Sequence, residues 1–236
     1  MLAMEQLEAR DQPTIDRFNA GELTFEQLAT EMTWAKKWKN YADYRALVEF
    51  AQQNGIPLRA LNAPPELIRA VSRGGGVDKL SPEQRAQLPA DLVLDDPTYE
   101  RLLNLQLAVH MAMDPARLRL VFEAQVSRDE TMAANIAAAR ALIGPEGQPR
   151  TVVVIAGTGH MRYGLGTPDR VRRRLPGIVD RIVLSTESGQ LKLSESDKAA
   201  MRDITITHAD LRALGRAPGD YLRVLPLAAA QPAATP

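Results

Sequence analysis

The sequence has no cysteine, no excess of charge of either sign and no long apolar run, and each absence excludes a class of protein. Without cysteine, the 236-residue chain cannot form disulfides, a thiol nucleophile, an iron–sulfur cluster or a cysteine zinc site. No apolar run approaches the roughly 18 residues that a transmembrane helix needs. The opening segment, MLAMEQLEAR, also lacks the basic start and the long apolar stretch of a signal peptide.

The charges of the chain are balanced, with 29 Lys and Arg residues against 29 Asp and Glu residues. A nucleic-acid-binding protein would be basic on one face, so we expect no nucleic-acid partner. The length and the 45% hydrophobic content suit one domain with a sizeable core. We predict a single domain over residues 1–226 and a disordered, Ala/Pro-rich tail over residues 227–236.

Local start signals predict a series of helices. Asp11 and Pro13 suit the cap and the first turn of one helix, and Thr24 with Gln27 has the spacing of a capping box. We expect a helical portion at about residues 65–144. Within it, helices are expected to begin at Ser81, Asp96 and Pro115.

Short apolar segments predict strands at residues 1–5, 56–64, 151–157 and 180–186, with weaker candidates at 204–207 and 221–226. The clearest is TVVVIAG at 151–157, where consecutive β-branched residues in an apolar run indicate a strand buried on both faces. Such a strand is typical of a parallel sheet covered by helices. Because strands alternate with helices, we predict an α/β fold with three layers: a mostly parallel sheet flanked by helices, with a helical insertion.

Polar residues follow the predicted strands at the points where the strands end. Glu5 closes the first strand, Asn62 lies near the end of the second, and GTGHMRYGLG at 157–166 follows the third. Ligands of open parallel sheets bind beyond the carboxyl ends of the strands. If the three strands are parallel, these residues share one rim, and we expect a single site there.

The segment at 157–166 carries the most chemistry. Gly157 and Gly159 allow the backbone to approach a ligand closely. His160 can bind a metal or transfer protons, and Tyr163 as phenolate suits ferric iron. Arg162 can meet a carboxylate of a ligand.

Each of these features also has a purely structural interpretation. A Gly-rich turn is common after a strand, and the arginine run at 170–174 is more often a solvated helix face. His110 is a lone helical histidine, which is usually structural. Trp34 and Trp38, four residues apart, are more often packing residues than a stacking platform.

VVVIAGTGHMRYGLGTPDRVRR, from residue 152, resembles the part of the ChaN-like haem-binding family that reads apolar strand, G-x-G-H, G-x-P and an arginine-rich helix. The segments ME at 4–5, LNAP at 61–64 and FEAQVSRDETMA at 122–133 agree with the family in order, as does His110. The resemblance runs from residue 1 to about residue 184. This combined order is more specific than any single motif.

The resemblance implies a protein for haem or iron uptake or storage, with haem held in a rim pocket that two protomers of an envelope lipoprotein share. Tyr163 is then the expected iron ligand, with His160 as a second ligand or hydrogen-bonding group, while Tyr41 and Tyr44 remain alternative ligands. The full set of candidate haem-binding residues is Glu5, Asn62, His110, Gln125, Gly157, Gly159, His160, Arg162 and Tyr163.

The resemblance extends to a wider group with erythromycin esterases, TraB and the Tiki metalloproteases, which supplies a hydrolase alternative. Glu5 and His160 would then be metal ligands or bases, supported by His110 and Gln125. Members usually carry a GExH-type segment upstream of the ME strand, and this sequence does not. That difference favours a binding protein over an enzyme, and leaves a truncated, inactive relative as a third interpretation.

The predicted first strand already contains Met1 and Met4, so we expect the true start to lie further upstream. That upstream region would also hold any export signal and lipid anchor.

Overall fold

The computed structural model describes residues 1–108, 114–142, 147–188 and 215–226. Its main sheet has three parallel strands, β1 (Leu2–Glu8), β2 (Leu58–Asn62) and β3 (Val153–Ile155), in the order β2-β1-β3. The predicted parallel sheet is therefore confirmed, with the first strand at its centre.

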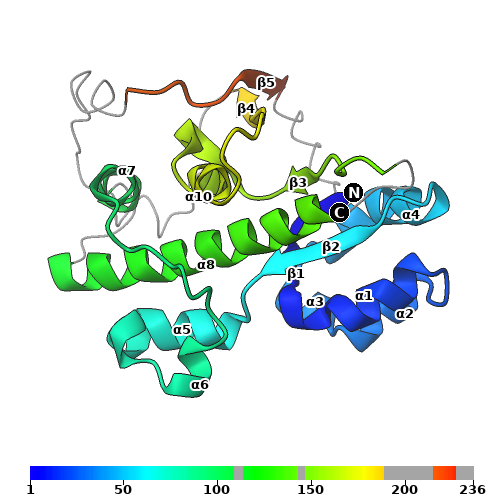
Figure 1. The fold of residues 1–236 in the computed structure, drawn as a ribbon, viewed down its shortest axis with the longest axis horizontal. Coiled ribbons are helices and arrows are strands. Elements are labelled where there is room, and N and C mark those ends of the chain that lie inside the picture. Colours follow the sequence, from blue (N-terminus) through cyan, green and yellow to red (C-terminus); the bar gives the residue numbers. More distant parts are fainter. Residues whose placement is uncertain (109–113, 143–146, 189–214, 227–236) are drawn as a thin grey trace, which may run out of the picture.

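Helices cover both faces of this sheet, as the three-layer prediction requires (Figure 1). On one face, Leu2, Met4 and Leu58 pack against a group of short helices. On the other, Ala3 and Leu61 pack against two helices that follow later in the chain. The first group is α1 (Gln12–Asn19), α2 (Phe25–Glu31), α3 (Trp34–Lys37) and α4 (Arg45–Gln53), and the later pair is α8 (Pro115–Ala141) and α10 (Thr167–Arg174).

The remaining helices are α5 (Pro65–Gly74), α6 (Pro82–Arg85), α7 (Pro97–Ala108) and α9 (Thr158–Met161). The first three, together with α8, occupy the predicted helical portion at 65–144. None of the described helices combines the length and the apolar character of a membrane span.

The prediction that the strand at 151–157 is buried on both faces is wrong. β3 keeps only residues 153–155, and the Val153 side chain is 55% exposed. Among the described residues β3 pairs with β1 alone, so it lies at the edge of the sheet. The strand that is buried throughout is β1, which continues past its predicted end at residue 5 to Glu8. Its pairing with β2 shifts register between Met4 and Glu8.

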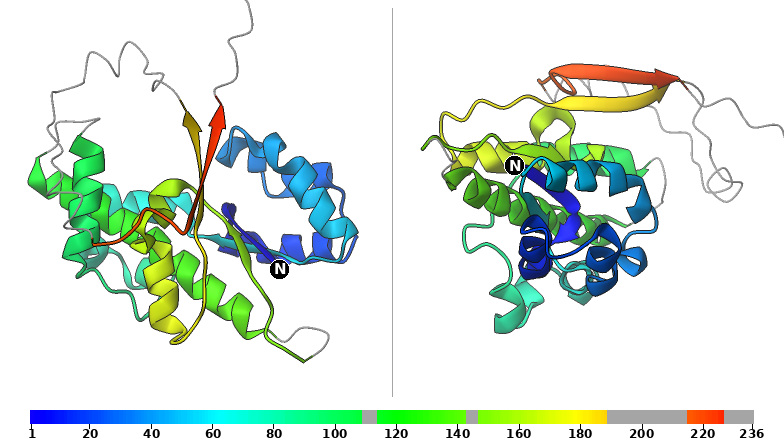
Figure 2. Two further views of the ribbon diagram at one scale, coloured as in Figure 1. Left: turned by 90° about the horizontal axis from the view of Figure 1, so that it is seen from above. Right: turned by 90° about the vertical axis from the view of Figure 1, so that its right-hand side faces the viewer.

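Two later strands form a separate parallel pair, β4 (Val183–Ser188) with β5 (Tyr221–Pro226). Figure 2 shows this pair outside the helical layers, away from the main sheet. The predicted strands at 180–186 and 221–226 are thus present but pair with each other. The candidate strand at 204–207 and the tail at 227–236 lie outside the described residues, and the division into one domain and a tail remains a prediction.

Two predicted helix starts differ in how they are stabilised. Thr24 and Gln27 form the predicted capping box, with both reciprocal hydrogen bonds present. Asp11 precedes α1 without capping it, because its carboxylate accepts a hydrogen bond from Lys37 Nζ at 2.7 Å. The start signal at Asp11 therefore predicts the position of α1 correctly. It does not predict that the Asp11 side chain binds Lys37 instead of capping the helix.

Trp34 is confirmed as a packing residue, since it is 1% exposed within the core against α1–α4. Trp38 lies just beyond the end of α3 and packs against the same core.

Replacing Leu58 by alanine should lower the free energy of unfolding by about 2–5 kcal/mol, because this side chain is fully buried beneath the helices. The matched control is Leu222→Ala in β5, where the leucine is 62% exposed and the change should stay within about 0.5 kcal/mol. Urea unfolding of both variants measures the difference. Equal losses would contradict the assignment of the core.

Candidate functional site

The structure brings Glu5 together with the segment that follows β3. The backbone N–H of Gly157 donates to Glu5 Oε2 at 2.6 Å, and His160 Nε2 lies 3.4 Å from Glu5 Oε1. Both side chains are buried, with His160 7% and Glu5 5% exposed. The parallel pairing of β1 with β3 sets this arrangement, because Glu5 follows directly after Met4, the last residue of β1 that pairs with β3.

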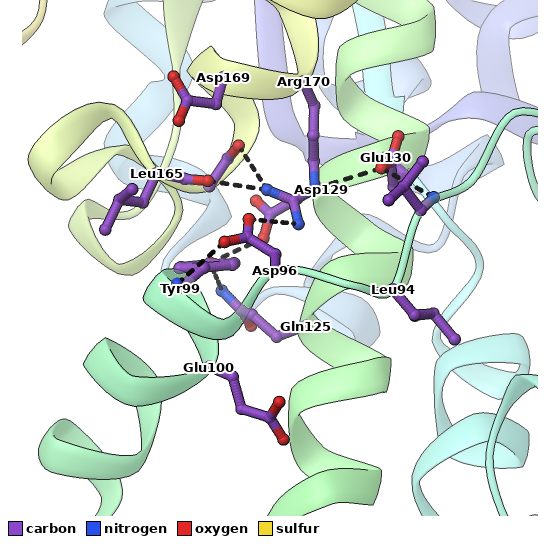
Figure 3. Close-up of polar contacts among 12 residues, drawn as sticks. Leu94, Asp96, Tyr99, Glu100, Gln125, Asp129, Glu130, Leu165, Asp169 and Arg170 are labelled. Carbon is purple, nitrogen blue, oxygen red and sulfur yellow. Dashed lines mark hydrogen bonds and ion pairs between the residues drawn. The ribbon is translucent and has the colours of Figure 1, made fainter.

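The carboxylate of Asp129, in the middle of α8, is contacted by one polar side chain from each of three other helices. Its Oδ1 accepts from Thr167 Oγ1 at 2.7 Å and lies 2.8 Å from His160 Nδ1, while its Oδ2 accepts from Tyr99 Oη at 2.7 Å. Its side chain is fully buried. Figure 3 shows Asp129 on α8, with Tyr99 of α7 reaching toward it. This carboxylate therefore ties α7, α9 and α10 to α8.

The charges around His160 fix its protonation state. Burial lowers the pKa of the imidazole, but the carboxylates of Asp129 and Glu5 outweigh burial and raise this pKa to about 10. Burial raises the pKa of Glu5, yet the bond to His160 and the Gly157 N–H bring it below its ordinary value. At neutral pH the ring is thus an imidazolium between two carboxylates.

This geometry leaves His160 no free nitrogen lone pair for a metal. Nδ1 faces Asp129, Nε2 faces Glu5, and the side-chain amide nitrogen of Gln125 lies 3.0 Å from Nδ1. The role of His160 as a metal ligand remains a prediction. The arrangement favours a structural role, in which His160 holds the adjoining turn in place. Gln125 takes part in the same network through Tyr99, whose hydroxyl lies 3.4 Å from the amide nitrogen.

Tyr163 lies on the turn that follows, in η4 (Arg162–Gly164). Its backbone is left-handed, with φ 58° and ψ 8°, which is uncommon for a residue with a side chain. The ring is half-buried and packs against an apolar cluster that includes Phe122 and Leu165. Its hydroxyl makes no hydrogen bond with any described residue. The phenol is thus held by apolar contacts and keeps its oxygen available.

Arginines near this turn differ in whether they are paired. Arg162 is exposed and makes no ion pair within the described part of the chain. The prediction that the run at 170–174 is a solvated helix face is wrong. Arg170 is 3% exposed, and its guanidinium, with those of Arg173 and Arg174, lies within 3.4 Å of the fully buried Glu130 carboxylate. These three arginines form ion pairs inside the protein, because the Glu130 carboxylate of α8 is buried beneath α10.

The glycines of the turn have different surroundings. A side chain built at Gly159 would meet nothing within 4 Å, so this glycine leaves room beside the rim. Gly157 is exposed, but a Cβ there would lie 3.4 Å from Glu5 Oε2. Gly166 has no such room, because a Cβ there would lie 2.3 Å from the carbonyl oxygen of His160. Only glycine lets α10 begin this close to α9.

The other predicted residues lie elsewhere. Asn62 is buried at the end of β2 but stands opposite Glu8 and makes no hydrogen bond to Glu5 or His160. His110 lies outside the described residues.

Tyr41 and Tyr44, the alternative iron ligands, pack around Trp34, with ring centroids 6.0 and 6.4 Å from its ring. Among the described residues, no three His, Cys, Asp or Glu side chains form a group that could hold a metal ion.

Sequence reasoning missed Asp129 and Tyr99 as site residues. Asp129 lies three residues after Val126 and four before Ala133, both of which are buried in the core. A carboxylate in such a row is the one available signal, since a buried charge needs partners.

Replacing Asp129 by asparagine should lower the free energy of unfolding by about 3–5 kcal/mol, because the change leaves the His160 charge buried without its closest partner. The control is Asp43→Asn, at an exposed carboxylate that makes no ion pair with the described residues, where about 0.5 kcal/mol or less is expected. Denaturant unfolding compares the two. Equal stability of both variants would contradict the central place of Asp129.

The pKa of His160 also predicts a pH dependence. Because the folded pKa of about 10 exceeds the ordinary 6.5, the stabilisation is complete below pH 6.5 and is lost as pH rises through 10. We expect urea midpoints to fall across this window and His160→Gln to flatten the decline. The same slope in both proteins would contradict a charged His160.

Comparison with known proteins agrees with the sequence resemblance. The model of the family described as "Haem-binding uptake, Tiki superfamily, ChaN" matches residues 1–171. A solved structure described as "Cofacial heme binding to ChaN of Campylobacter jejuni" shares the fold, with a TM-score of 0.59 and 19% identity over 83% of this chain and 71% of that one. No curated protein matches the chain. The chain belongs to the ChaN haem-binding uptake family of the Tiki superfamily.

Proposed function

We propose that this chain binds ferric haem at the rim of its sheet, with the Tyr163 phenolate as iron ligand. The observation that carries the proposal is the Tyr163 side chain itself. A left-handed residue presents it, apolar residues flank its ring, and its hydroxyl has no hydrogen-bond partner among the described residues. Left-handed backbone at a residue with a side chain costs free energy and recurs at functional sites.

The neighbouring residues fit a haem in chemistry. A phenolate oxygen is a hard donor that suits ferric iron. Arg162 is exposed next to it, free of internal ion pairs with the described residues, and its guanidinium suits a propionate. The open space at Gly159 gives a flat ligand room beside the backbone. Haem would supply the ferric centre, and the chain would bind and orient it.

The buried charges have a supporting role in this proposal. Asp129 and His160 hold α9 against α8, and Thr167 holds the start of α10 to the same carboxylate. Tyr163 lies between these two attachment points, so its position depends on both. Tyr41 and Tyr44 are less suitable ligands, because their rings are packed in the aromatic cluster around Trp34.

The wider setting is part of the same proposal. The family description names haem uptake, and the Campylobacter structure is described as one of cofacial haem binding to that protein. These descriptions support a haem-uptake role. Haem at the interface of a homodimer is proposed on the family resemblance. A lipid-anchored location in the cell envelope is proposed on the family resemblance alone. No observation favours the hydrolase alternative.

Titration of the purified chain with ferric haem, followed by absorbance and light scattering, tests the proposal. We expect saturable growth of a Soret band, a phenolate-to-iron charge-transfer band and association into dimers. Tyr163→Phe should remove the charge-transfer band and weaken binding by at least about tenfold, because it removes the oxygen donor. Tyr41→Phe is the matched control and should bind like the wild type.

Two outcomes would count against separate parts of the proposal. Absence of saturable binding by the wild-type chain would refute haem binding. Binding with an identical spectrum in Tyr163→Phe would refute only the choice of ligand.

A further inference from the structure

We propose that residues 215–220, which lead into β5, act as a clasp that positions Tyr163 for ligand binding. The inference rests on the proposed role of Tyr163 as iron ligand. Its central observation is a single backbone contact: the N–H of Tyr163 donates to the carbonyl oxygen of Pro218 at 2.8 Å. Residues 55 positions apart in the sequence are thereby joined at the residue that presents the phenol.

Tyr163 needs such a contact for two reasons. Left-handed backbone at a residue with a side chain persists only where its surroundings enforce it. Its N–H group also lies on a short turn, and a backbone donor removed from water must find an acceptor. Pro218 supplies the acceptor and so helps to hold φ at 58°.

Two anchors keep the clasp in place. Arg216 Nη1 lies 2.5 Å from Asp169 Oδ2 on α10. Asp220 Oδ2 accepts from the backbone N–H of Ile182 at 2.7 Å, and the Asp220 N–H donates back to the Ile182 carbonyl at 2.9 Å. Pro218 lies between these anchors, so its carbonyl cannot shift freely. Figure 1 shows the stretch that leads into β5 above α10.

Close packing at one further residue restricts the clasp. A Cβ built at Gly219 would lie 3.1 Å from the Ile182 carbonyl oxygen and from Leu184 Cγ. This approach lets the backbone run directly against the start of β4. The pairing of β4 with β5 then continues from the clasp, since residues 183 and 221 are the first pair of the ladder. The separate β4–β5 sheet thus fixes the far side of the Tyr163 turn.

The clasp lies outside the part of the chain that the family model covers, because that match ends at residue 171. We therefore assign a role in the haem site to a segment beyond the matched region. Arg216 and Asp220 are positioning residues, which act through the backbone at Tyr163.

The test is the double variant Arg216→Ala/Asp220→Asn in the full chain. The control is Arg223→Ala/Asp43→Asn, which makes the same charge changes at exposed side chains without ion pairs to the described residues. We expect amide hydrogen exchange at Tyr163 to accelerate at least about tenfold in the test variant, with exchange in β1 unchanged. Ferric haem should bind about tenfold more weakly, with a shifted charge-transfer band. The control should match the wild type in all three measurements.

If the test variant fails to fold, Arg216→Ala alone is used, because the Arg216 side chain is 43% exposed and contributes little to stability. Wild-type exchange at Tyr163 and an unchanged charge-transfer band in a folded variant would overturn the clasp and leave haem binding intact. Absence of haem binding by the wild-type chain would overturn the proposed function itself.

Discussion

The site depends on one buried negative charge, the carboxylate of Asp129. A carboxylate withdrawn from water is costly, and it is tolerated because donors from Tyr99, His160 and Thr167 converge on it. Each donor lies on a different element, so satisfying one charge fixes the relative positions of α7, α9 and α10 on α8. The electrostatic contacts of Asp129 therefore fix the helices at the rim of the sheet without any contribution from a ligand.

The residue after Asp129 extends the same principle. Glu130 is also fully buried and lies against three arginines of α10. Asp129 thus holds α7, α9 and α10 through two hydroxyl groups and a histidine, and Glu130 adds a second attachment of α10 through guanidinium groups. The balanced composition of 29 basic and 29 acidic residues reflects in part this internal pairing. Arg162 makes no ion pair with the described residues, and its positive charge is exposed at the surface.

The features that sequence patterns predict correctly depend either on neighbours along the chain or on the rule that parallel strands end at one rim. The capping box at Thr24, the parallel strands and the approach of Glu5 to His160 follow from local patterns and from the rule for strand ends. Sequence patterns do not predict which strands pair with each other or which side chains meet in the folded chain. The valine run of β3 is equally compatible with the centre or the edge of a sheet, and nothing in the sequence marks β4 and β5 as a pair of their own. Asp129 escapes prediction because a carboxylate in a long helix usually faces solvent, and only the folded chain brings its three donors to it.

The central position of β1 has a consequence for how the chain folds. Met4 pairs with Ile155, and the backbone nitrogen of Met1 donates to the Thr151 carbonyl, 150 residues later. β1 leaves the ribosome well before β3, so the sheet is completed only after residues 153–155 have been made. Long-range parallel pairing of this kind slows folding and leaves an apolar strand unpaired for longer. During synthesis, the helices at residues 12–53 are available to shield β1 before either neighbouring strand is made, so they would serve as a temporary cover for a strand whose second neighbour arrives late.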